Sequence, residues 1–222
     1  LFMVLVLGAS KKLRVFGDEL KTVAARPKKL LGAMICSVLI SVNWLTYIWA
    51  VNSEQIIETS LGYYINPLFS VLLGIIVLKE KLTFWQTVSF LLAATGVLNM
   101  TLHFGSVPWI ALVLAASFGL YGLFKKLVNV GAVFGITLET LLITPFALIF
   151  LGYMHHGGGG TISLAAPVLS GLLIGAGIVT AVPLILFASG ANRLPLSVVG
   201  FIQYIAPTIA LGLGIFLSHE PF

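Results

Sequence analysis

Two short motifs place aromatic, amide and proline side chains inside long apolar stretches: Gly-Tyr-Tyr-Ile-Asn-Pro at 62–67 and Gln-Tyr-Ile-Ala-Pro at 203–207. Tyrosine rings can stack on a ligand, and their hydroxyl groups can form hydrogen bonds. The amides of Asn66 and Gln203 each carry a donor and an acceptor, so they could orient a polar group. These residue types indicate noncovalent binding of a small molecule.

Residues in three other apolar stretches are further candidates for such a site. They are Asn43, Trp44 and Tyr47, then Glu139, and then Thr180 with Pro183 and Phe187. Asn43 either faces a binding site or bonds a neighbouring helix. Glu139, beside Thr137 and Thr140 with Pro145 further along, either recognises a substrate or carries a coupled proton, or it is a water-exposed carboxylate near a helix start.

The composition indicates that these stretches are membrane spans. Charged residues make up 9% of the chain, hydrophobic residues make up 59%, and the mean hydropathy is +1.11. A soluble domain is about 25% charged. The apolar runs are continuous over about twenty residues, which suits a membrane-spanning helix, whereas the strands of a membrane barrel alternate with a period of two. The sequence therefore predicts an all-α integral membrane protein.

The basic residues predict which connections lie in the cytoplasm. We expect a stub at 1–9 and seven full spans near 30–51, 56–78, 82–102, 106–128, 133–154, 168–190 and 195–218. All 12 Lys and Arg residues fall in four connections that alternate along the chain, and the intervening connections hold none. The positive-inside rule then places residues 10–29 and Arg193 in the cytoplasm. Glu58 is expected to be water-exposed near the opposite interface.

The basic segment at 10–29 has two interpretations. Leu13, Phe16, Leu20 and Val23 recur at helical spacing, as in a helix that lies on an anionic membrane surface. We favour instead a solvated loop whose basic residues set the topology, because short amphipathic patterns arise easily.

The two motifs belong to an internal repeat. When the sequence is shifted by 140 residues, 30–82 aligns with 170–222 without a gap, and most of the identical positions fall between 64 and 80. The identical pairs include Tyr64/Tyr204, Pro67/Pro207 and Glu80/Glu220. Because five spans separate the two copies, their helices run in opposite directions, which is the inverted repeat of many secondary transporters.

The prolines of the repeat explain why the motifs could form a site. Pro67 and Pro207 lie near the middle of their spans, where each removes a backbone hydrogen bond and kinks its helix. In a bilayer such backbone is tolerated only beside protein or a water-lined cavity. We therefore expect Tyr64 and Tyr204 to face one central cavity. The alternative is that these residues are structural, since proline also serves packing in membrane helices.

The repeat also predicts two halves. They are 1–102, truncated at its N-terminus, and 103–222, truncated at its C-terminus. Residues 1–9 correspond to 141–149, and the copy of 82–102 is missing. We expect the intact protein to be an inverted-repeat bundle of ten helices, of which this chain lacks the first, most of the second and the last.

Four segments carry a family resemblance. SLGYYINPL and LGIIVLKEKL, followed by NRLPLSVVGFIQYIAPT and the final EPF, resemble the RarD branch of EamA-type permeases in the drug/metabolite transporter superfamily. The resemblance covers nearly the whole chain. It implies a multi-pass permease of the bacterial inner membrane with a central cavity, and it implies export as the direction of transport.

We therefore predict a secondary-active permease that moves a small organic metabolite or drug by alternating access. Its partners would be that substrate, the lipid bilayer and, in one alternative, a coupled proton, with no nucleic acid and no cofactor. The driving gradient, the substrate and the oligomeric state stay open.

The sequence also argues against two other classes of protein. A non-transporting scaffold or sensor bundle gives no reason for matched kinks in inverted halves. An intramembrane enzyme needs a nucleophile with its base, or a metal triad, at membrane depth. Cys36 has no histidine within its span, and His155 and His156 precede an expected flexible connection, Gly157–Gly160, that offers no further metal ligands. We therefore expect neither an enzyme nor a metal site.

The charge distribution predicts opposite exposure of two connections. Single cysteines introduced at Lys21 and Gly158, in a Cys36→Ala background, should react with an impermeant thiol reagent from opposite sides of the membrane. Labelling of both cysteines from one side would contradict the assigned spans.

Overall fold

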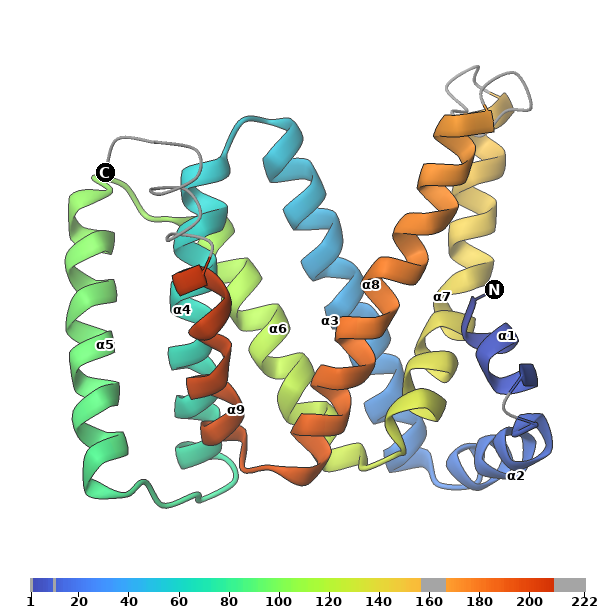
Figure 1. Cartoon of the computed structure of the whole chain (residues 1–222), viewed down its shortest axis with the longest axis horizontal. Helices are drawn as coiled ribbons and strands as arrows, with labels where there is room; N and C mark the ends of the chain where they lie inside the picture. The colour runs from blue at the N-terminus through green and yellow to red at the C-terminus, as the bar shows by residue number, and fades with distance from the viewer. Residues whose placement is uncertain (1, 10, 157–166, 210–222) are drawn as a thin grey trace. The chain divides into compact units, whose positions relative to one another are not determined.

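The computed structural model describes residues 2–9, 11–156 and 167–209, and all regular secondary structure in these ranges is helical (Figure 1). The helices in these ranges are α1 (Phe2–Ala9), α2 (Leu13–Ala24), α3 (Pro27–Asn52), α4 (Ile56–Ile76), α5 (Phe84–His103), α6 (Trp109–Val128), α7 (Ala132–His156), α8 (Pro167–Arg193) and α9 (Leu196–Gln203). The all-α prediction is confirmed. Glu220 and the connection Gly157–Gly160 lie outside the described residues.

Five of the helices in the described ranges, α3, α4, α6, α7 and α8, are long and apolar enough to cross a membrane. The predicted span at 82–102 forms α5, but α5 is not among these five because Gln86 and Asn99 lower its mean hydropathy. The apolar helix Leu196–Ile209 is the described part of the predicted span at 195–218. These helices make the chain a multi-pass membrane protein.

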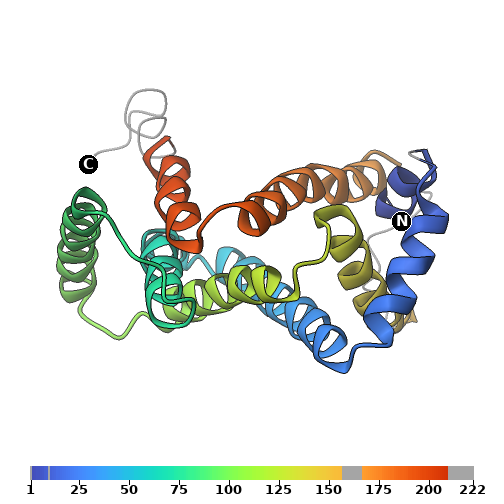
Figure 2. The ribbon, with the colours of Figure 1, turned by 90° about the horizontal axis from the view of Figure 1, so that it is seen from below.

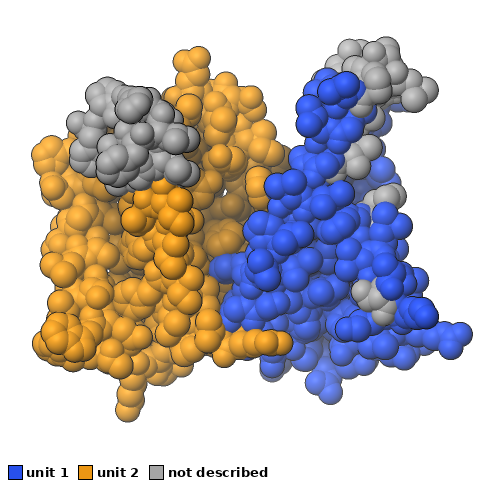
Figure 3. Space-filling view, in the orientation of Figure 1, with its two compact units in different colours: residues 1–38, 127–192 blue, residues 39–126, 193–222 orange. Residues whose placement is uncertain are grey.

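The chain divides into two compact units, which Figure 3 shows in different colours. Unit 1 consists of Leu1–Val38 and Leu127–Asn192, and unit 2 consists of Leu39–Lys126 and Arg193–Phe222. The boundary falls within α3, so this helix contributes its first part to unit 1 and its last part to unit 2.

In unit 1, α2 packs against α1 and α7. The ring of Phe16 stacks on the ring of Phe134 with 6.2 Å between centroids, and Val23 is buried in an apolar cluster with residues of α3 and α7. The prediction of a solvated loop at 10–29 is therefore wrong for Leu13–Ala24. The apolar spacing matches this packing in part, because Phe16 and Val23 contact other helices of unit 1, whereas Leu13 and Leu20 stay 49% and 38% exposed.

In unit 2, α4 and α9 lie side by side and run in opposite directions (Figures 1 and 2). Gly74, near the end of α4, faces Ser197 at the start of α9. Further along α9, a Cβ atom at Gly200 would lie 2.8 Å from the carbonyl oxygen of Pro67 and 2.8 Å from Cγ2 of Val71. The two helices therefore cross so closely that α9 has no room for a side chain at Gly200.

The prolines affect the two crossing helices differently. The regular part of α9 ends at Gln203, Tyr204 adopts a turn, and helical conformation resumes at 205–209. Pro207 lacks the N–H group that would bond the carbonyl group of Gln203, which accounts for the turn at this point. By contrast, α4 continues as one helix through Pro67.

Two further prolines also lie inside continuous helices. They are Pro145 in α7 and Pro183 in α8. The sequence predicts a kink at each of these prolines, and neither proline ends its helix.

The close crossing predicts opposite effects for two glycine substitutions. Gly200→Ala should destabilise the protein by about 1–3 kcal/mol, because the new methyl group clashes with the backbone of α4. Gly96→Ala in α5 is the matched control, because nothing lies within 4 Å of its Cβ position. Alanine there should stabilise the helix by about 0.5–1 kcal/mol. Unfolding midpoints in detergent would measure both effects, and equal midpoints for the two variants would contradict the crossing.

Candidate functional site

The structure brings the two repeat tyrosines into direct contact. The hydroxyl group of Tyr204 donates a hydrogen bond to the carbonyl oxygen of Tyr64, at 3.1 Å. This carbonyl group lies in the turn of α4 that precedes Pro67. A membrane interior offers no water to such groups, so the contact satisfies a polar hydroxyl group at the crossing. A central cavity around these residues stays a prediction.

The two amides of the motifs also meet at the crossing. Asn66 Nδ2 donates a hydrogen bond to Gln203 Oε1, at 2.7 Å. The second atoms of these amides, Asn66 Oδ1 and Gln203 Nε2, are buried and have no hydrogen-bond partner among the described residues. A buried polar group without a partner costs about 1–3 kcal/mol. The buried pair therefore lowers the stability of the fold, unless its unbonded atoms have a further role.

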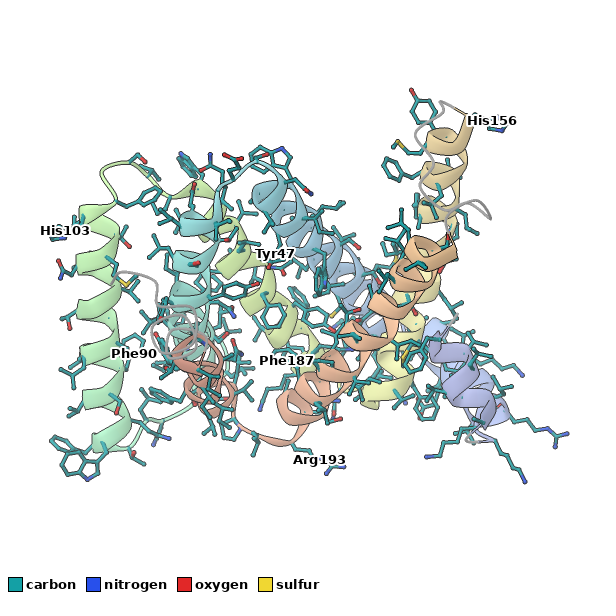
Figure 4. All side chains as sticks on the ribbon, turned by 45° about the horizontal axis from the view of Figure 1, so that its top comes forward. Tyr47, Phe90, His103, His156, Phe187 and Arg193 are labelled. Atoms are coloured by element: carbon teal, nitrogen blue, oxygen red, sulfur yellow. The ribbon has the colours of Figure 1, made fainter. Side chains whose placement is uncertain are left out.

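An aromatic cluster extends from α3 to α4. Trp44 and Tyr47 form an edge contact with 6.1 Å between ring centroids, and Tyr47, labelled in Figure 4, forms another with Tyr63 at 6.0 Å. Tyr63 is 50% exposed. It was missed in the sequence because the repeat aligns Tyr64 with Tyr204 and gives Tyr63 no tyrosine partner. Its spacing of three residues from Asn66 was the available signal, because residues at i and i+3 share a helix face.

Asn43 joins α3 to α6. Its Nδ2 atom donates hydrogen bonds to the carbonyl oxygen of Leu114, at 3.0 Å, and to Oγ of Ser117, at 2.9 Å. Both amide hydrogens are therefore used in helix packing. This geometry favours the structural interpretation of Asn43.

Glu139 and Thr180, with Pro183 and Phe187, lie in unit 1, whereas the candidates of α3, α4 and α9 lie in unit 2. Glu139 is only 4% exposed, so the alternative of a water-exposed carboxylate is wrong for this conformation. The hydroxyl group of Thr180 donates a hydrogen bond to the carbonyl oxygen of Ala176 within α8, at 2.9 Å.

Glu80, which follows α4, accepts three hydrogen bonds from the start of α9. Its Oε1 atom accepts a hydrogen bond from Leu196 N–H at 2.7 Å, and its Oε2 atom accepts from Ser197 N–H at 2.8 Å and from Ser197 Oγ at 2.7 Å. These N–H groups belong to the first turn of α9, where they have no partner within the helix and favour a negative charge. The carboxylate of Glu80 therefore caps α9.

The backbone conformation after α4 directs the carboxylate of Glu80 toward the start of α9. Lys79 adopts a left-handed conformation with φ of 56°, and the N–H group of Glu80 returns to the carbonyl oxygen of Gly74, at 3.0 Å. Desolvation raises the pKa of Glu80, but the hydrogen bonds from Ser197 and Leu196 and the charge of Lys126 together lower the pKa below its ordinary value.

Three basic connections meet at this end of unit 2. Lys126 Nζ lies 3.7 Å from Glu80 Oε1 and donates a hydrogen bond to the carbonyl oxygen of Leu194. Arg193, labelled in Figure 4, lies at the adjoining turn between α8 and α9. This arrangement agrees with the prediction that these connections share one side of the membrane.

A second glutamate caps a second helix. Glu58, in the first turn of α4, is 9% exposed, and its Oε1 atom accepts a hydrogen bond from the N–H group of Ile110, at 2.7 Å. The prediction that Glu58 is water-exposed is therefore wrong. Its acceptor role depends on the N-terminal end of α6, which the sequence around Glu58 does not reveal.

Comparison with known proteins identifies the family. Residues 1–102 match the EamA-like transporter family. The chain is 48% identical over 227 aligned residues to the uncharacterized transporter YojE of Bacillus subtilis, covering 100% of this chain and 73% of that relative. It is 42% identical over 219 residues to protein RarD of Salmonella typhimurium, covering 99% and 73% of the two chains. It is also 41% identical over 194 residues to the uncharacterized transporter PA0485 of Pseudomonas aeruginosa, covering 87% and 65%.

The chain belongs to the EamA-like transporter family, in its RarD-type branch. The resemblance found in the sequence motifs is therefore confirmed, and the chain is a membrane transporter of this family. None of the three relatives' names states a substrate. No solved structure matches the chain significantly.

The cap at Glu80 predicts a loss of stability at acid pH. Because the folded pKa is lowered, the stabilisation is fully present above the ordinary pKa of 4.5 and is lost as the pH falls through the folded pKa. Glu80→Gln should therefore lower the free energy of unfolding at pH 7 by about 1–3 kcal/mol and weaken this acid dependence.

Melting curves in detergent between about pH 3 and 7 would measure both effects, with the exposed Glu54→Gln as a control that retains the wild-type profile. Equal acid dependence in the Glu80 variant and the wild type would show that this carboxylate does not stabilise α9.

Proposed function

We propose that the protein is a secondary-active permease that moves a small organic metabolite or drug by alternating access, outward across the bacterial inner membrane. The observation that carries the proposal is the crossing of α4 and α9. Tyr204 and Gln203 contact α4 there, directly beside the break that Pro207 imposes on α9. Broken helices at the membrane midplane form the substrate sites of many secondary transporters.

The substrate pathway in this proposal includes the aromatic cluster beside the crossing. Trp44, Tyr47 and Tyr63 provide ring faces, and the exposure of Tyr63 leaves part of its ring accessible. Tyr63 lies one helical turn from Asn66, so the rings and the amide pair adjoin on one face of α4. A substrate could stack on the cluster while it bonds to the amides.

The proposal includes two inverted halves, 1–102 and 103–222. Inverted halves require that matching helices run in opposite directions. The antiparallel arrangement of α4 and α9 supports this requirement, since these helices carry the two copies of the Tyr/Pro motif.

Glu139 is the residue that we propose for proton coupling. Its carboxyl group is buried within a membrane-spanning helix, where an ionisable residue is a functional candidate. Driving transport by a proton gradient would require a group that binds and releases a proton in each cycle. A carboxyl group in a buried position can do so if water reaches it in one of the alternating conformations.

Transport by the purified protein in proteoliposomes tests the proposal. The protein, with all the sequence that its gene encodes, would be given a metabolite mixture with and without a pH gradient. Accumulation of at least one compound above protein-free vesicles is expected, and Glu139→Gln should abolish its dependence on the pH gradient while exchange continues. Movement of no compound in either direction would refute a permease.

The two repeat tyrosines are predicted to contribute to substrate affinity. Tyr64→Ala and Tyr204→Ala should each weaken binding of the transported compound by about 1–2 kcal/mol, because a ring contact or a hydrogen bond is lost. Tyr153→Ala in α7 is the control, since this side chain is 78% exposed. A change in thermal stability with an unchanged binding constant would instead assign both tyrosines to packing.

A further inference from the structure

The crossing of α4 and α9 leaves one buried acceptor and one buried donor without a partner in the part of the chain that the structure describes. They are Asn66 Oδ1 and Gln203 Nε2, the second atoms of the two amides that bond each other at 2.7 Å. The oxygen and nitrogen atoms of an amide can be interchanged in assignment. Interchanging both amides reverses the bond between them and again leaves one donor and one acceptor. The leftover pair is therefore the same for either assignment.

This arrangement is costly for a purely structural contact. Each buried polar atom without a partner loses its hydration and gains nothing in return. Two apolar side chains of similar size at Asn66 and Gln203 would pack the same helices without that loss. Native proteins keep few such atoms, and each one calls for an explanation.

We propose that Asn66 and Gln203 bind the substrate of the permease through one acceptor and one donor, so that the substrate carries an amide-type edge. Such an edge presents an N–H group beside a C=O group, as in a primary carboxamide or a lactam. The inference rests on the proposed permease function and specifies the substrate class of the same site.

The surroundings of the pair favour an uncharged group. The side chain that each amide bonds is the other amide, which carries no charge. The carboxylates nearest the two ends of α4, Glu58 and Glu80, are bonded to the N-terminal turns of α6 and α9. A carboxylate or ammonium group would be desolvated at the amides without an opposite charge from these residues.

The position of the pair also fixes when it can bind. Both leftover atoms are covered in this conformation. A substrate reaches them in a conformation in which α4 and α9 have separated at Gln203, where the helix is already interrupted. The ring of Tyr63, one turn away, then provides a flat surface beside the amide-type edge.

Matched small probes test this inference. Benzamide and 2-pyridone carry the edge, whereas benzoate and acetophenone have acceptors only. Binding of each probe to the complete protein in lipid nanodiscs would be measured by saturation-transfer NMR, with empty nanodiscs as the blank. The wild type should bind benzamide and 2-pyridone at least about tenfold more tightly than the other two probes, which corresponds to at least one missing hydrogen bond.

The double variant Asn66→Leu/Gln203→Leu separates recognition from packing. Because both partners are replaced, it should fold with a melting midpoint at or above that of the wild type. It should nevertheless lose the preference for benzamide and 2-pyridone. Asn192→Leu is the matched control, since Asn192 also has a buried oxygen atom without a partner but lies in unit 1. This variant should keep the preference.

Three results would overturn the inference: no preference among the probes in the wild type, a preference retained by the double variant, or a preference lost equally in the Asn192 control. The amide pair would then serve packing or hold a water molecule. The permease function would still stand if proteoliposomes transport a compound without an amide-type edge, so the two proposals can fail separately.

Discussion

Helix α4 is held at both ends by carboxylates that accept hydrogen bonds from the first turns of other helices. Glu58 accepts from α6, and Glu80 accepts from α9 through both of its oxygen atoms. The first N–H groups of any helix lack partners within that helix, and lipid cannot supply them. Glu58 satisfies one of these groups in α6, and Glu80 satisfies two of them in α9. The positions of both helices in unit 2 therefore depend on α4.

Between these ends the contact of α4 with α9 changes character. Near Glu80 it is close and well bonded, with Gly74 facing Ser197, and in the middle Gly200 lets the backbone of α9 approach Pro67. Around Gln203 the helix is interrupted, and the amides satisfy only part of their hydrogen-bonding capacity. Separating the helices at the amides would therefore cost less than separating them at the cap. This asymmetry suits a transporter whose helices open at the substrate while one end stays attached.

The sequence predicted correctly those structural features that depend on a single property of the chain, such as apolar length or the internal repeat. Apolar length predicted the all-α membrane class, and the repeat predicted that the helices bearing Tyr64 and Tyr204 run in opposite directions. Predictions failed where the outcome depends on a partner far along the chain. Leu13–Ala24 forms a helix whose Phe16 and Val23 pack against residues of α7 and α3, and Glu58 is buried because α6 begins beside it.

Two features of the site had weaker signals in the sequence. Glu80 was visible only as one of the identical positions of the repeat, and its bonding to Ser197 requires the fold of unit 2. Tyr63 was hidden by the stronger match of its neighbour Tyr64. In both cases the repeat pointed to the correct stretch of chain, but contacts across 116 and 117 residues decided the role of Glu80, and the ring contact with Tyr47 on α3 placed Tyr63.

The proposed opening at the amides requires α4 and α9 to move relative to each other during transport. Spin labels at Ile57→Cys and Ile209→Cys, in a Cys36→Ala background, would report the separation of the helices at the end that opens, without altering the amide pair. Both side chains are exposed, at 76% and 56%. Distances would be measured by pulsed electron resonance in lipid nanodiscs, on labelled protein that retains transport. We expect two populations of the distance between the labels, and their ratio should change when a transported compound is added. One narrow distribution, unchanged by that compound, would contradict it.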